Sequence, residues 1–163
     1  MTRKTLLALA ALTLAGAAQA SIYNFTGSFD NDPNTSVLNG SFSFDDAQVA
    51  AGGADGAFDL SSLNFNFNGE TFTLGQARPN SAYVQFEGGT LTGPNGVFDT
   101  SGSGALALQS FFGSSNFTFS DARGDQLGTL TLTAATAVPE PATLALVLGG
   151  LGIVGFIARR RSL

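Results

Sequence analysis

The stretch SLNFNFNGETFTLG, residues 62–75, decides the class of fold. Leu63, Phe65 and Phe67 alternate with asparagines, which is the two-residue period of a strand that buries one face. Asn68-Gly69 follows and supplies the residue pair that a type I′ turn favours. The stretch therefore predicts a β-hairpin with a two-residue turn.

The pairing across that turn agrees with the hydrophobic pattern. With Asn68-Gly69 as the loop, Phe67 faces Glu70, Phe65 faces Phe72, and Leu63 faces Leu74. Both apolar pairs fall on one face of the hairpin, so the turn and the buried face specify the same register.

Six further stretches repeat this alternation and are separated by Gly, Asn and Asp: residues 21–29, 37–45, 82–93, 104–112, 116–120 and 128–134. We count eight or nine strands and no convincing amphipathic helix. This pattern predicts an all-β fold, an antiparallel two-sheet sandwich with a jelly roll as one form of it. The 15 phenylalanines are the expected core filler.

Charge is distributed unevenly along the 163 residues. Five of the seven basic residues lie in the end segments, so residues 21–137 hold two arginines against eleven carboxylates, a net charge of −9. An acidic body repels phosphate backbones, which argues against a nucleic-acid partner. The chain has no Cys and no His, which excludes thiol nucleophiles and removes the usual zinc ligand and catalytic base. We therefore expect a protein that is not an enzyme and needs no cofactor.

The first 20 residues, MTRKTLLALAALTLAGAAQA, have the three parts of a secretory signal peptide. Arg3 and Lys4 form a positive start, and an apolar run extends from Leu6 to Ala18. Ala18-Gln19-Ala20 is a small-x-small cleavage site, so we expect cleavage between Ala20 and Ser21. An uncleaved anchor or an amphipathic helix is the alternative.

A second apolar segment, Ala142 to Ala158, contains seventeen residues without a charge. As a helix it spans roughly 26 Å, just enough for a hydrocarbon core of about 30 Å. Arg159, Arg160 and Arg161 follow, and the positive-inside rule places them in the cytoplasm and the acidic body outside. A buried core helix is the alternative.

Pro139-Glu140-Pro141 immediately precedes the predicted span, where the two prolines favour extended backbone. A helix-start signal is an equal alternative from physics alone. The order of Pro-Glu-Pro, apolar helix and Arg159 to Arg161 resembles the PEP-CTERM sorting tail of Gram-negative envelope proteins. That resemblance implies a partner, a membrane-embedded cysteine transpeptidase called an exosortase, which cuts near Pro-Glu-Pro.

The body offers weak candidates for chemistry. Residues 30–34, DNDPN, have alternating oxygen ligands, but Thr35 and Ser41 stand where a calcium loop needs Gly and Glu, so we expect a solvated turn and no metal. Asp45-Asp46 with Asp55 and Asp59 are carboxylates that a glycan hydrolase would need. Arg123-Gly124-Asp125 reads first as a hairpin loop.

The sequence thus predicts a signal peptide at 1–20, a β-sandwich domain at 21–132, a linker at 133–138 and a sorting tail at 139–163, with a transmembrane helix at 142–158 and a basic end at 159–161. We expect the body to be tethered to the inner membrane from the periplasm, then moved to the cell surface or matrix after processing. A noncatalytic structural or glycan-binding role, in an extracellular polysaccharide or biofilm, is the leading hypothesis. The alternatives are a carboxylate-dependent glycan hydrolase and a simple membrane-anchored protein without processing.

Overall fold

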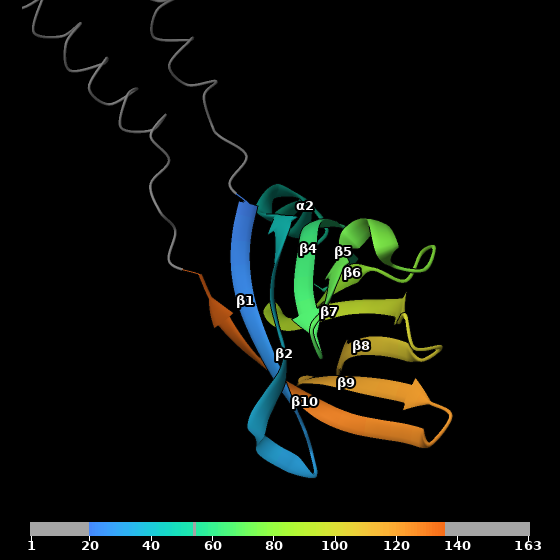
Figure 1. Cartoon of the computed structure of the whole chain (residues 1–163). Coiled ribbons are helices and arrows are strands. Elements are labelled where there is room, and N and C mark those ends of the chain that lie inside the picture. The colour runs from blue at the N-terminus through green and yellow to red at the C-terminus, as the bar shows by residue number, and fades with distance from the viewer. Residues whose placement is uncertain (1–19, 54, 136–163) are drawn as a thin grey trace, which may run out of the picture.

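Ten strands and two short helical turns form the body, which the computed structural model describes for residues 20–53 and 55–135 (Figure 1). The elements are β1 (Ala20–Phe29), β2 (Asp32–Asp45), α2 (Asp46–Ala51), β3 (Gly56–Phe58), β4 (Leu60–Phe67), β5 (Glu70–Thr73), η1 (Leu74–Gln76), β6 (Tyr83–Glu87), β7 (Thr90–Asp99), β8 (Ala105–Phe111), β9 (Ser114–Asp121) and β10 (Gly124–Ala134). The all-β prediction is confirmed.

The predicted hairpin forms as β4 and β5. Phe67 pairs with Glu70 and Phe65 with Phe72, as predicted. The third pair, Leu63 with Leu74, is wrong because β5 ends at Thr73. The Gln76 side chain accepts a hydrogen bond from the Thr73 backbone N–H at 2.8 Å, and this capping starts the 3₁₀ turn η1 in place of a longer strand.

The two-sheet sandwich is wrong, because all ten strands belong to one sheet. Their order is β3-β6-β7-β8-β9-β10-β1-β2-β4-β5. Figure 1 shows why the strands still enclose a core: β1, β2 and β4 run across the direction of β7, β8 and β9. The sheet curls so that one part of it packs against the other, and a single sheet therefore forms both layers around the core.

The bend lies where β10 passes from one neighbour to the other. Its first half pairs with β9 and its second half with β1, and Gly128 pairs with both Phe117 and Phe29. A Cβ at Gly128 would lie 2.3 Å from the Phe117 ring, so only glycine lets the ring pack against this backbone. Sequence alternation reveals the strands, but it does not reveal that their ladder continues around a corner.

After β5, at one end of the sheet, the chain crosses to β7 on the opposite part of the curl. Ala77 forms an antiparallel bridge with Phe98 of β7, and the Arg78 N–H donates to the Val97 carbonyl at 2.8 Å. These contacts join the chain beyond β5 to β7. The two parts of the curled sheet are therefore in direct contact at this point.

Phenylalanine fills the core, as predicted. Phe42, Phe65, Phe98 and Phe117 are each at most 1% exposed. The Phe65 ring lies 5.0 Å from Phe98 and 5.1 Å from Phe72, in edge-to-face and stacked arrangements. Truncating such a ring to alanine costs about 3–5 kcal/mol.

The predicted signal peptide and membrane span lie outside the described residues, apart from Ala20. Within residues 20–53 and 55–135, no helix has the length and apolar character needed to cross a membrane. Strand β10 includes Thr133 and Ala134, the first two residues of the expected linker.

Candidate functional site

The first and last strands of the body lie side by side at their outer ends. Tyr23 of β1 pairs with Ala134 of β10, and the Ala135 N–H donates to the Ile22 carbonyl at 2.9 Å. The strands are antiparallel, so β1 starts where β10 finishes (Figure 1). We call this place the joined ends, residues 20–23 and 134–135.

The predicted signal-cleavage junction is part of the joined ends. Ala20 pairs with Asp45 and Ser21 with Phe44, both on β2. The Ser21 hydroxyl donates to an Asp46 carboxylate oxygen at 2.9 Å. On the other side, the register with β10 begins only at Tyr23. The junction between Ala20 and Ser21 is thus paired with β2 on one side, and the register with β10 does not reach it.

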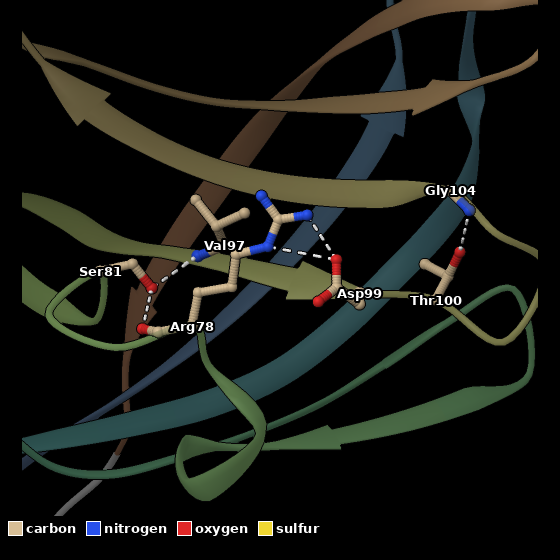
Figure 2. Close-up of polar contacts among 6 residues, drawn as sticks. All are labelled: Arg78, Ser81, Val97, Asp99, Thr100 and Gly104. Atoms are coloured by element: carbon tan, nitrogen blue, oxygen red, sulfur yellow. Dashed lines mark hydrogen bonds and ion pairs between the residues drawn. The ribbon is translucent and has the colours of Figure 1, made fainter.

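A polar hollow of about 440 Å³ lies at the C-terminal end of β7, the strand that ends at Asp99. Its lining residues come from β7, the β7–β8 connection, the start of β8, the end of β9 and, for Arg78, the connection between η1 and β6: Arg78, Asp99, Thr100, Ser103, Gly104, Ala105, Ser120 and Asp121. Figure 2 shows the Arg78 guanidinium reaching Asp99, and both Nε, at 3.1 Å, and Nη2 donate to the same carboxylate oxygen. The hydrogen bond from Arg78 lowers the pKa of Asp99, and the same hydrogen bond raises the pKa of Arg78.

Hydrogen bonds between side-chain hydroxyls and the backbone hold the chain around this hollow. The Ser81 hydroxyl donates to the Arg78 carbonyl at 2.7 Å and accepts from the Val97 N–H at 3.1 Å (Figure 2). The Gly104 N–H donates to the Thr100 hydroxyl at 3.1 Å. The Arg78 charge is already paired, so the hollow offers hydroxyl and carboxylate oxygens to a ligand.

Four of the six carboxylates considered for hydrolysis or calcium make structural hydrogen bonds: Asp30, Asp45, Asp46 and Asp55. Asp45 caps α2 through the Ala47 N–H at 2.9 Å, and Asp55 accepts from the Gly88 N–H. Asp30 accepts from the Thr129 hydroxyl at 3.1 Å. Across the described residues, no three His, Cys, Asp or Glu side chains gather in a group that could hold a metal ion.

Arg123-Gly124-Asp125 lies at the connection of β9 and β10. The Arg123 N–H donates to an Asp121 carboxylate oxygen at 2.7 Å, and β10 starts at Gly124. Arg123 thus lies in a hairpin turn, as the sequence predicts, whereas Gly124 and Asp125 are already paired with β9 as the first residues of β10.

Sequence reasoning missed an exposed aromatic turn between β8 and β9. Phe112 has a φ of 52° and is 97% exposed. The Glu87 carboxylate accepts from the Phe112 and Gly113 N–H groups, each at 2.8 Å. The available signal was Gly113, directly after the alternating stretch 104–112, but that stretch ends with Phe112, and phenylalanine is not a residue that such turns favour.

A family model described as the PEP-CTERM protein-sorting motif matches residues 137–161. The chain carries a PEP-CTERM sorting motif. Nothing matches it among the curated proteins or the solved structures. The matched range includes the predicted residues Pro139, Glu140 and Pro141 and the basic cluster Arg159 to Arg161.

The PEP-CTERM motif implies an exported protein that is sorted toward the envelope, with an exosortase as its processing partner. The predicted sorting residues lie outside the described residues, as does Ala18 of the signal-cleavage site.

Proposed function

We propose that this chain is a noncatalytic protein of the cell envelope or extracellular matrix, exported and then cut from its membrane tail by an exosortase. Residues 142–158 hold the body at the outer surface of the inner membrane until the cut is made near Pro139-Glu140-Pro141. The observation that carries the proposal is the PEP-CTERM motif at residues 137–161, which follows the last strand almost at once.

The joined ends support this topology. Until the signal peptide is cut off between Ala20 and Ser21, the signal peptide and the segment at residues 142–158 would attach both ends of the body to the same membrane, so both ends would then lie toward that membrane. The ladder between Tyr23 and Ala134 places them next to each other. A body with its ends on opposite sides would need a long spacer at one of them, and here only a few residues separate β10 from the motif.

The noncatalytic part of the proposal is supported by the chemistry of the side chains. The chain lacks Cys and His, and the carboxylates Asp45, Asp46 and Asp55 accept structural hydrogen bonds. A glycosidase needs one carboxylate as an acid and a second as base or nucleophile at a set separation. Carboxylates engaged in holding turns and helix ends are poorly suited to that work.

Replacing Pro139, Glu140 and Pro141 with alanine tests the sorting step. Alanine favours helix over the extended geometry that the prolines impose, so the variant should stay full-length in the inner membrane. Wild type should lose an epitope fused after Leu163 and move outward. Immunoblots of fractionated cells measure both outcomes.

A matched control replaces Thr136, the residue just before the matched range 137–161, with alanine. This variant should be processed like wild type, because the motif and the membrane segment are unchanged. If wild type and the triple variant both keep the epitope and fractionate together, the tail is only an anchor and the sorting proposal is wrong.

A further inference from the structure

The outward face of five neighbouring strands carries uncharged hydrogen-bonding side chains in two continuous rows. Alternate side chains of a strand point to opposite faces, so residues between the buried Phe and Leu positions point outward. The first row runs through Thr131, Thr26, Asn39, Asn66 and Thr71, on β10, β1, β2, β4 and β5. The second row runs through Thr133, Asn24, Ser41, Asn64 and Thr73 on the same strands.

We call these ten residues the polar ladder. Strands lie about 4.8 Å apart and alternate residues about 7 Å apart, so the ladder spans roughly 19 Å across the strands. Eight of the ten residues are exposed, and Asn66 and Ser41 are half-buried. Within the described part of the chain, only Asn66 and Thr73 among them make a side-chain hydrogen bond. The other eight can therefore donate to and accept from a partner.

Charge is kept away from the polar ladder. All eleven carboxylates of the body lie in connections, in the helix, or within the first two or the last residue of a strand. Exposed strands commonly carry charged residues among their polar ones, and this body has enough carboxylates to place some on the ladder. The separation leaves a surface that can bind without desolvating an ion.

The chemistry of the polar ladder favours a neutral polyhydroxyl partner. Protein interfaces depend on apolar and aromatic side chains at their centre, and lipid surfaces on apolar or basic ones, and the ladder has neither. An anionic polymer would be repelled by a body of net charge −9. A neutral glycan exchanges hydrogen bonds with Thr, Ser and Asn, and repeated weak contacts along one chain add up.

We infer that the polar ladder binds a neutral polysaccharide that lies across β10, β1, β2, β4 and β5. This inference rests on the proposed noncatalytic surface role and names its partner class and its residues. The five strands lie next to one another in the ladder, and Figure 1 shows β10, β1, β2 and β4 as one continuous surface.

Replacing Thr26, Thr71 and Thr131 with valine tests the inference. Valine keeps the shape of threonine and has a high β propensity, so the fold is retained while three hydroxyls of one row are lost. The full chain, purified in mild detergent, is incubated with the neutral and acidic polysaccharide fractions of the producing cells and with phosphatidylethanolamine vesicles. We expect wild type to co-sediment with the neutral fraction and the valine variant to bind it at least about tenfold more weakly.

Two control variants separate hydrogen bonding from shape. Serine at the same three positions keeps the hydroxyls and should retain binding within about threefold of wild type. Valine at Thr35 and Thr90, exposed threonines outside the polar ladder, should leave binding unchanged. If wild type ignores the neutral fraction, prefers the acidic fraction or the vesicles, or binds equally well as the valine variant, the inference is overturned.

The sorting proposal is measured separately in the same cells. The valine variant should lose its tail and move outward like wild type, because the PEP-CTERM motif is unchanged. Lost binding with normal release assigns the defect to the polar ladder. If wild type keeps its tail, the sorting proposal is wrong. The binding measurement then tests the polar ladder by itself.

Discussion

The turn between β4 and β5 and the turn between β8 and β9 have almost the same backbone but different sequences. Asn68 and Gly69 have φ values of 50° and 86°, and Phe112 and Gly113 have 52° and 72°. Both turns thus have the left-handed φ at two central residues that a type I′ turn requires. Asparagine adopts this conformation readily, and phenylalanine does so at a cost.

The two turns are held by different partners. In the first, the Gly69 N–H donates to the Asn66 side chain three residues earlier, at 3.0 Å. In the second, Glu87 reaches from β6, 25 positions before Phe112, and accepts from both turn residues. Local sequence thus fixes the first turn, and a distant carboxylate holds the second in place.

Removing the distant carboxylate should have the largest effect on this pair of turns. Glu87→Ala leaves two backbone N–H groups without a charged acceptor, so we expect a loss of about 2 kcal/mol in the free energy of unfolding. Asn66→Ala removes one neutral acceptor and should cost about 1 kcal/mol. Urea unfolding followed by circular dichroism measures both. A Glu87→Ala cost below that of Asn66→Ala would contradict the assignment of Glu87 as the clamp.

Exchanging the first residue of each turn should have opposite effects. Asn68→Phe should destabilise by about 1 kcal/mol, and Phe112→Asn should stabilise by about 0.5–1 kcal/mol. The Phe112 ring is 97% exposed, so little packing is lost when it is removed. Thermal unfolding of both variants checks the signs. Destabilisation by Phe112→Asn would show that the ring contributes contacts beyond the turn.

The smallest expected effect concerns the pair of Arg78 and Asp99, another contact made over a distance in sequence. The pKa of Asp99 is lowered in the folded state, so its contribution is present above the unfolded pKa and lost as the pH falls through the folded pKa. Arg78→Gln should therefore narrow the difference in urea midpoint between pH 7 and pH 3. Both side chains are more than half exposed, so the change should be slight. If Arg78→Gln shows the same difference in urea midpoint as wild type, the pair of Arg78 and Asp99 contributes nothing to stability.

These contrasts also explain how much the sequence could predict. The hairpin around Asn68-Gly69 and the core role of phenylalanine follow from period and turn chemistry, and both are confirmed, apart from the predicted pair of Leu63 and Leu74. The single curled sheet could not be predicted, since it depends on Gly128 packing against Phe117 and on Ala77 meeting Phe98. The contact of Asp99 with Arg78 depends on that curl, and the contact of Glu87 with Phe112 depends on the order of β6, β7 and β8 in the sheet, so neither could be read from local sequence.

The sorting residues could be predicted because the motif is defined by the order of residues along the chain and needs no knowledge of the fold. Pro139-Glu140-Pro141, an apolar segment and three arginines are recognised by order and spacing, and the family model matches the same range. The polar ladder is the opposite case. Its ten residues are scattered from position 24 to position 133, and only the register of five strands brings them into rows.

The joined ends also set an order in which the sheet can be completed. Tyr23 and Ala134 are 111 positions apart, and β1 is a central strand that needs β10 on one side. Pairing across so long a stretch of chain is slow, and it cannot happen before β10 is available. One edge of β1 therefore stays open until the last strand joins it, so the sheet is completed by the strand that comes directly before the PEP-CTERM motif along the chain.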